Sequence, residues 1–368
     1  MTSFRRSSKA KIYNRIKLTT GVSSSVFVFI LLLALVLSGW SREMDRFAHA
    51  VSSNSFAALL VFVLAIGLLQ ACVTLPLAFF AGYTVEHRYH LSNQTVGGWF
   101  LEQVKGYAVG LPLVLGLLAL VYFSLRSLGQ WWWLPVATIL TLLSVVLARI
   151  APVVILPLFY KFVPLQEGTL KERILSLCTT AGIRINGIFT FNLSKNTRKA
   201  NAGFAGIGRT RRIILADTLV DDFTEEEIET VFAHEMGHYV HRHILQGILT
   251  GAASTFISLF LAAQLYQWSV AELGFSSVTQ LAALPLLALW LSLLGLVFSP
   301  LGNILSRHRE RQADTYAVRT TAKRDAFVAA LRRLESMNLA DPEPHPLVEL
   351  LFYTHPPMAK RIRFLESL

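Results

Sequence analysis

The sequence predicts a mainly α protein, a polytopic helical membrane protein of about six spans with a small cytoplasmic α+β domain. Its 368 residues are 53% hydrophobic and only 15% charged, and the mean hydropathy is +0.50. That composition is too apolar for an ordinary soluble domain. Six apolar runs are long enough to cross a bilayer, and a long polar stretch separates the fourth run from the fifth.

The charge of the chain indicates a membrane partner. The net charge is +11 and the sequence pI is near 9.8. The basic residues lie in blocks beside the apolar runs, as the positive-inside rule predicts for cytoplasmic loops, and no RNA- or DNA-binding motif accompanies them. We therefore expect the lipid bilayer as a partner and no nucleic acid. Cys72 and Cys178 fall in a predicted span and in the polar stretch, which predicts two free thiols.

The first apolar run, 22–40, follows a basic segment. Residues 1–19 hold six basic side chains and no acidic one. A cleavable signal peptide is the alternative, but the run is long and residues 41–44 offer no small-x-small cleavage site. We expect a retained span with the N-terminus in the cytoplasm.

The remaining runs complete the topology. They predict spans at 56–80, 106–125, 132–147, 244–268 and 281–300, and an interfacial or broken extension with two prolines at 150–162. Six spans leave most of the other Lys and Arg in cytoplasmic segments, whereas the short external loops carry only three arginines. The chain then divides into 1–160 (tail and first four spans), 161–243 (cytoplasmic α+β segment), 244–303 (last two spans) and 304–368 (cytoplasmic helices).

Local patterns predict the elements outside the membrane. Within 161–243 they indicate a helix at 170–181 and strands at 188–191 and 212–215, and a capping box at 224–227 begins the last helix. After the sixth span we expect helices at 304–318 and 322–337, a proline-rich turn at 341–346, and a final helix after 354–357.

The helix after the capping box carries an HExxH motif. His234 and His238 leave the same face of that helix and can take adjacent corners of a zinc tetrahedron, although two solvated surface histidines are the alternative. Glu235 can act as general base toward a water that the metal activates. Gly237 costs about 1 kcal/mol of helix propensity relative to Ala, and we interpret it as making room for a close neighbour at the metal. His241 and His243 are expected at the membrane interface rather than on the metal.

A catalytic zinc site needs a third protein ligand, and Glu310 is the candidate. It follows the sixth span, on the same predicted side of the membrane as His238. Asp314 is one helical turn further on and suits a carboxylate that orients a ligand histidine. The alternative for this pair alone is a solvated helix face among three arginines.

These motifs together resemble the type I CAAX prenyl protease family of integral-membrane zinc metallopeptidases. The resemblance runs from about residue 80 to the C-terminus, and its markers are EHRYHLSNQT at 86–95, NAGFAG at 201–206, RIILAD at 212–217, HEMGH at 234–238, Glu310 with Asp314, and HPP at 355–357. It implies one zinc ion per chain bound by His234, His238 and Glu310, with Glu235 as catalytic base and Asp314 as a supporting acid. It also implies a chamber walled by membrane helices, with the zinc at its cytoplasmic end.

Two departures from the family pattern indicate the kind of organism from which the chain comes. Eukaryotic members have seven spans, and some carry a long charged insert before the zinc helix, whereas this chain has six predicted spans and no such insert. A compact bacterial member of the plasma membrane is therefore favoured, with the ER membrane as the location if the source is eukaryotic.

Two sets of residues are candidates for substrate binding. Metallopeptidases commonly hold a substrate as an added strand on an exposed sheet edge, and Asn201, Ala202 and Gly203 begin a small-residue strand that could supply such an edge. A plain loop is the alternative. His355 could donate a hydrogen bond to a developing oxyanion or cap the C-terminal helix with its prolines, and the sequence leaves both roles open.

The sequence thus predicts a membrane zinc endopeptidase of the CAAX prenyl protease type. Its substrate is a peptide or membrane protein, either prenylated at its C-terminus or, for a heat-shock-type quality-control protease, without a lipid. A transporter with a structural zinc predicts charged residues along the spans, but the predicted spans are almost free of acids. The intact HExxH motif and Glu310 argue against an inactive scaffold.

The predicted topology is open to direct labelling. Cysteines introduced near Asn196 and at the C-terminus should react only with reagents that reach the cytoplasm, and cysteines at 270–278 only from outside. The reason is the basic N-terminus combined with six spans. Labelling of the Asn196 region from outside would invert the topology.

Overall fold

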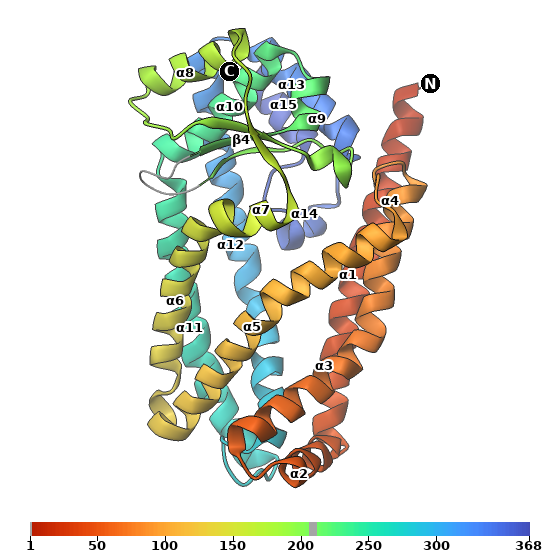
Figure 1. Ribbon diagram of the computed structural model, residues 1–368, viewed down its shortest axis with the longest axis vertical. Helices are drawn as coiled ribbons and strands as arrows, with labels where there is room; N and C mark the ends of the chain where they lie inside the picture. The colour runs from red at the N-terminus through yellow and green to blue at the C-terminus, as the bar shows by residue number, and fades with distance from the viewer. Residues whose placement is uncertain (1, 206–211) are drawn as a thin grey trace.

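The computed structural model describes residues 2–205 and 212–368, and six long helices dominate it (Figure 1). Each is long and apolar enough to cross a membrane, which confirms the six predicted spans. They are α1 (Thr2–Leu37), α3 (Ser55–Phe79), α5 (Val96–Leu128), α6 (Trp133–Ile150), α11 (His243–Glu272) and α12 (Leu284–Thr321). The N-terminus lies at the same end of the molecule as the β-sheet (Figure 1).

Together with the turns that continue them, the six helices are longer than the predicted spans, and three of them continue into segments for which a different structure was predicted or none. The helix that begins as α3 continues through a π-turn, η1 (Phe80–Thr84), into α4 (Val85–Arg88). Likewise α6 continues through η3 (Ala151–Ile155) into α7 (Leu156–Phe159), so the extension predicted at 150–162 is a helix with a π-bulge, where Pro152 has no N–H to donate. The helix predicted at 304–318 is not separate, because α12 runs unbroken to Thr321 and thus projects from the span as one rod.

Several short helices were not predicted, and two that lie outside segment 161–243 are separate from the six long helices. The loop expected at 41–55 contains α2 (Trp40–Val51), which lies at the end of the molecule opposite the sheet (Figure 1). The buried Asp45 of α2 accepts a hydrogen bond from the backbone N–H of Ala282, 3.3 Å away, and so ties α2 to the turn before α12. The other is α14 (Pro346–Phe352), which follows the proline-rich turn. Short 3₁₀ turns occupy Gly129–Trp131 (η2), Leu193–Lys195 (η4) and Leu281–Ala283 (η6).

A four-stranded sheet lies at one end of the helices. Its strands are β1 (Phe162–Pro164), β2 (Ile188–Phe191), β3 (Ala202–Ala205) and β4 (Arg212–Ala216), in the order β1-β2-β4-β3. The central pair is parallel and both outer pairs are antiparallel. The strands predicted at 188–191 and 212–215 are confirmed, and β3 is a strand at an edge of the sheet rather than a loop. Gly206, the last residue of the NAGFAG motif, lies outside the described residues.

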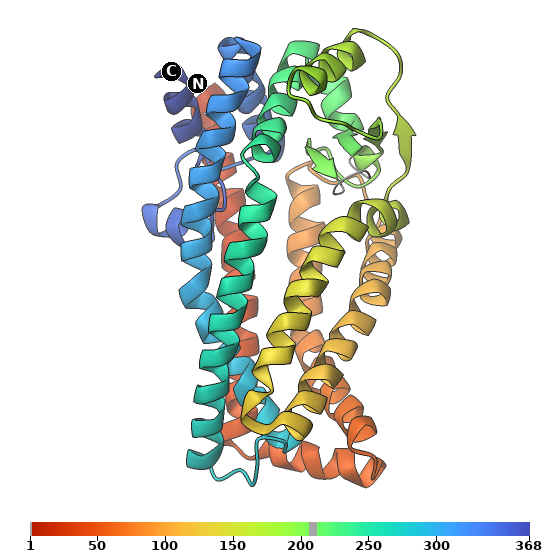
Figure 2. The ribbon, with the colours of Figure 1, turned by 90° about the vertical axis from the view of Figure 1, so that its left-hand side faces the viewer.

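Helices cover this sheet and share one apolar core with it. They are α8 (Thr169–Thr180), α9 (Asp217–Asp222), α10 (Glu225–Val240), α13 (Arg324–Asn338) and α15 (Met358–Glu366). The fully buried Ile213 of β4, Phe232 of α10 and Phe327 of α13 belong to this core. A second cluster around Tyr266 joins α6, α11 and α12 within the membrane region, and α11 and α12 run side by side (Figure 2).

A buried carboxylate connects the membrane helices to the sheet. Glu86 of α4 accepts hydrogen bonds from the Tyr13 hydroxyl at 2.7 Å and from the Lys17 ammonium at 2.8 Å, both on α1. Its other oxygen lies 3.1 Å from Nζ of Lys199, which precedes the edge strand β3. The chain that leads into β3 is therefore anchored to the first membrane helix.

Helices α10 and α12 cross in close contact at Gly237. A Cβ atom at this position would lie 2.9 Å from Cα of Ala313 and 3.1 Å from Cβ of Tyr316. The glycine that the sequence shows inside the HExxH motif thus lets α12 approach, and α12 carries Glu310 and Asp314.

Substituting Gly237→Ala should push α10 and α12 apart. Overpacking of this kind costs about 1–3 kcal/mol, which exceeds or cancels the ~1 kcal/mol gained in helix propensity. We expect a lower thermal unfolding temperature in detergent and weaker metal binding. Gly251→Ala in α11 is the control, because an added Cβ there meets nothing within 4 Å. Equal stability and equal metal binding for both variants would contradict the tight crossing.

Candidate metal centre

His234 and His238 point to a common site from one face of α10. The helix begins at the predicted capping box, where Thr224 Oγ1 accepts from the Glu227 N–H at 3.3 Å and Glu227 accepts from the Thr224 N–H at 2.8 Å. The Nε2 atoms of the two histidines are 3.2 Å apart. Two imidazole nitrogens are therefore directed to one point.

Glu310 brings a carboxylate to the same point from α12. Its Oε1 lies 3.2 Å from His238 Nε2, and its Oε2 lies 3.3 Å from His234 Nε2. Ligand atoms about 2.0–2.1 Å from a tetrahedral zinc ion are separated by roughly 3.3–3.4 Å, so the two Nε2 atoms, 3.2 Å apart, fit adjacent corners of such a tetrahedron. Glu310 presents one oxygen to each imidazole, and one ligand atom from each of the three side chains lies within 4.8 Å of the others. Among the described residues, this is the group of three side chains that could hold a metal ion.

The hydrogen bonding of these groups also fits a metal. Glu310 Oε2 is buried and receives no hydrogen bond. Asp314 Oδ1 lies 2.8 Å from His234 Nδ1, so this nitrogen donates to the carboxylate and leaves Nε2 directed at Glu310. Burial lowers the pKa of His234, but the hydrogen bond to Asp314 and the nearby Glu310 carboxylate outweigh burial and raise it to about 9. A metal ion would displace the Nε2 proton and supply the cation that Oε2 lacks.

Arg361 was not predicted to take part in the site. This buried side chain of α15 donates to Asp314 through Nε at 3.0 Å and through Nη2 at 2.5 Å. Its guanidinium neutralises Asp314, which leaves Glu310 and Glu235 as carboxylates that a divalent cation would balance. No local spacing in the sequence links residue 361 to the HExxH motif, so this contact could be found only from the fold.

His243 begins α11, and its side chain lies behind His238. The side chain is buried, and its Nδ1 lies 2.9 Å from His238 Nδ1. Its ring nitrogens face His238 Nδ1 and Gln312 Oε1, so neither is directed at the candidate metal position, as predicted. His241 is exposed and stacks on His243, with ring centroids 5.6 Å apart.

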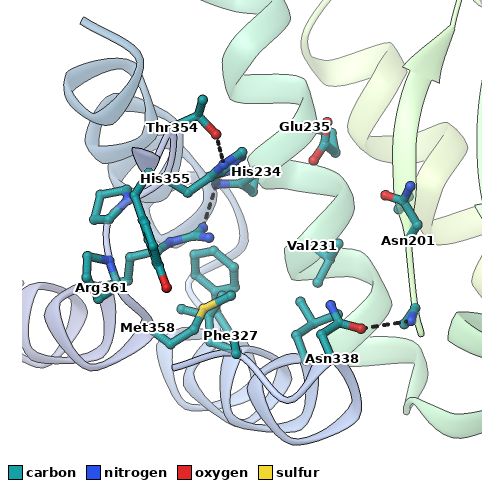
Figure 3. A pocket seen from close by; sticks show the side chains of 18 of the residues that line it. Asn201, Val231, His234, Glu235, Phe327, Asn338, Thr354, His355, Met358 and Arg361 are labelled. Carbon is teal, nitrogen blue, oxygen red and sulfur yellow. Dashed lines mark hydrogen bonds between the residues drawn. The ribbon is translucent and has the colours of Figure 1, made fainter. Parts of the chain in front are cut away.

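Glu235 faces a cleft beside the three candidate ligands. The cleft has a volume of about 470 Å³, and both His234 and Glu235 line it. Figure 3 shows Glu235 projecting from α10 toward the side on which Asn201 lies. Burial raises the pKa of Glu235 above that of an ordinary carboxyl, against the opposing effect of His234 and His238. A carboxylate of raised pKa is a stronger proton acceptor, as a general base requires.

The edge strand forms the opposite wall of the cleft. Asn201 and Ala202 line it, whereas Gly203 is not among the lining residues. The Ala216 N–H donates to the Asn201 carbonyl at 2.9 Å, so these two residues form a hydrogen-bonded pair. In an antiparallel ladder such pairs alternate, and the backbone groups of Ala202 and Phe204 consequently face away from β4.

His355 extends into the cleft from the loop before α15. Its Nε2 lies 3.3 Å from Glu310 Oε1, and its Nδ1 lies 2.9 Å from Thr354 Oγ1 (Figure 3). The residue at the N-cap of α15 is Pro357, and no side chain caps that helix. His355 therefore does not cap α15, and its ring lies in the cleft beside Glu310.

Comparison with known proteins gives a consistent family. Residues 164–368 match the family model of peptidase family M48, and residues 4–161 match a model described as CAAX prenyl protease N-terminal, five membrane helices. The chain is similar to the uncharacterized metalloprotease YhfN of Bacillus subtilis (strain 168), with 31% identity over 94% of this chain and 82% of that protein.

Eukaryotic relatives are also similar. Identity to CAAX prenyl protease 1 of Saccharomyces cerevisiae is 29%, over 86% of this chain and 74% of the yeast protein. The crystal structure of S. mikatae Ste24p superposes with a TM-score of 0.84 at 26% identity, covering 98% of this chain and 89% of that one. Fold and sequence thus indicate the same family.

Removal of the Glu310 carboxylate should lower the metal content of the site. The purified protein should contain about one divalent metal ion per chain, and Glu310→Ala should lower this content sharply because only two of the three donors remain. Glu343→Ala is the control, since Glu343 lies far along the chain from the HExxH motif and pairs with the exposed Arg363. The measurement is the number of metal ions per chain in both purified variants. An unchanged metal content in Glu310→Ala would mean that another residue is the third ligand.

Proposed function

The chain belongs to peptidase family M48 and is a membrane metalloendopeptidase, and on that premise we propose that His234, His238 and Glu310 bind one catalytic zinc ion. The observation that carries this proposal is the convergence of three donors at separations of 3.2 and 3.3 Å beside Glu235. Two imidazoles and one carboxylate with an open fourth position are typical of catalytic zinc in peptidases.

We propose that Glu235 is the general base of peptide-bond hydrolysis. Bound zinc would supply Lewis acidity, which lowers the pKa of a water molecule and polarises a carbonyl group. Glu235 takes one proton from the attacking water as the water oxygen bonds to the scissile carbonyl carbon. The same carboxyl then gives that proton to the departing amine nitrogen as the C–N bond breaks, and Glu235 is again an ionised carboxylate at the end of the cycle.

We propose that Asp314 and His355 support this reaction in different ways. Asp314 orients His234 through the contact at 2.8 Å and is itself held by Arg361. His355 lies within reach of Glu310 and of the cleft, where its imidazole can donate a hydrogen bond to the oxyanion that develops on the scissile carbonyl.

The substrate is proposed to bind as an added strand on β3. Asn201, Ala202 and Gly203 lie on the edge strand or directly before it, and the backbone of Ala202 is free of β4. A peptide strand on that edge would run along the cleft wall that faces Glu235. The positive-inside rule supports a cytoplasmic position for this site, in a bacterial plasma membrane or, for a eukaryotic source, the ER.

Two substrate classes are to be distinguished. Several relatives are named CAAX prenyl proteases, which favours a peptide with a C-terminal prenyl lipid. The similarity to an uncharacterized bacterial metalloprotease keeps a quality-control protease of unlipidated membrane proteins as the second candidate. Purified protein should be incubated with a farnesylated CAAX peptide and with an unlipidated membrane protein, each with and without a chelator. Chelator-sensitive cleavage of only the first substrate would exclude the second candidate.

Glu235→Gln separates metal binding from catalysis. The amide keeps the shape of the side chain but cannot take a proton from water, so turnover should fall by about 10²–10⁴-fold while metal content stays unchanged. Substrate affinity should also persist, because the edge strand and the cleft are unaltered. Glu343→Gln serves as control and should cleave normally. Near-normal cleavage by Glu235→Gln would refute the proposed mechanism.

A further inference from the structure

A chain of hydrogen bonds leads from His238 away from the candidate metal position. His238 Nδ1 lies 2.9 Å from His243 Nδ1, and His243 Nε2 lies 2.9 Å from Gln312 Oε1. The three side chains come from α10, α11 and α12, respectively. His243 is only 6% exposed, so water does not compete for its ring nitrogens. None of the roles proposed above for substrate or metal uses His243 or Gln312.

For a neutral His243 ring, the acceptor at the far end sets the direction of the hydrogen bonds in this chain. Gln312 Oε1 is a carbonyl oxygen that can only accept, so His243 must carry its proton on Nε2. The neutral His243 ring then has a lone pair on Nδ1, and His238 must donate to it from its own Nδ1. With its proton on Nδ1, His238 presents a lone pair on Nε2, which is the atom that faces Glu310.

The backbone between the two histidines makes this contact possible. Arg242 has φ 56 and ψ 34, the left-handed conformation, which is uncommon for a residue other than glycine. This turn ends α10 and starts α11, and it brings the ring of His243 back onto that of His238, with centroids 5.0 Å apart. A strained residue of this kind persists when its surroundings hold it in place, here between a zinc-motif helix and a membrane span.

We propose that His243 and Gln312 are positioning residues that fix the tautomer and the ring orientation of His238 for metal binding. The proposal rests on the metal-ligand role of His238 proposed above. It assigns each ligand histidine its own partner: His234 has the carboxylate Asp314 on α12, and His238 has the neutral imidazole of His243 on α11. Partners of this kind typically contribute 10–100-fold to metal affinity.

The test compares two substitutions of His243 in the full chain, purified in detergent. His243→Phe keeps the ring but offers His238 no acceptor, whereas Oδ1 in His243→Asn can take the place of Nδ1 and accept. Zinc affinity, measured by competition with a chromophoric chelator, should fall about 10–100-fold in His243→Phe and stay within a few-fold of the parent in His243→Asn. His241→Phe is the matched control, since His241 is exposed and stacks on His243 without contributing to the chain of hydrogen bonds.

A second pair of variants guards against misfolding at His243. Gln312→Leu removes the acceptor that sets the tautomer and should weaken zinc binding in the same direction, while Gln312→Glu keeps an acceptor and should not. Thermal unfolding of the metal-free proteins separates folding from metal affinity. Parent-like zinc affinity in both His243→Phe and Gln312→Leu would overturn the proposal, as would equal losses in His243→Phe and His243→Asn.

His238→Ala, measured in parallel, distinguishes this inference from the function on which it rests. If His238→Ala keeps its zinc, the proposed ligand set is wrong. If His238→Ala loses zinc while His243→Phe retains it at parent affinity, the ligand set stands and only the positioning role of His243 fails.

Discussion

The crossing of α10 and α12 at Gly237 is the contact on which the site depends. A missing side chain at Gly237 lets Ala313 approach, and one helical turn before Ala313 lies Glu310. Because α12 is continuous from the membrane to Thr321, the position of the third donor is set by a membrane span and not by a loop. Rigid elements hold donor separations more closely than loops do, which a metal site requires.

Charge is the second constraint. The described site contains Glu235, Glu310 and Asp314 close to a single buried guanidinium, that of Arg361. Burying unpaired carboxylates is costly, so this arrangement is stable only with further positive charge, from a proton on His234 or from a divalent metal ion. Burial, reinforced by the nearby Glu310 carboxylate, raises the proton affinity of Glu235 and thereby prepares it as a base.

Local patterns in the sequence predicted the elements with strong periodicity or specific chemistry. The six spans, the central strands, the capping box and the HExxH helix follow from residues near each other in the chain. Strand β1 was not predicted, because three residues are too few to show a periodic pattern. Helix α2 was not predicted, because it lies between the first two spans, where a loop was expected. Arg361 and the contact of His243 with His238 depend on how distant helices pack, and no spacing in the sequence encodes that packing.

X-ray absorption at the zinc edge of the purified protein tests the central claim, a zinc ion held by His234, His238 and Glu310, most directly. We predict a first shell of nitrogen and oxygen atoms at about 2.0–2.1 Å, with the outer-ring scattering of two imidazoles and no sulfur. Loss of one imidazole in His238→Ala should accompany loss of zinc. A sulfur shell near 2.3 Å, or a zinc ion without imidazole ligands, would contradict it.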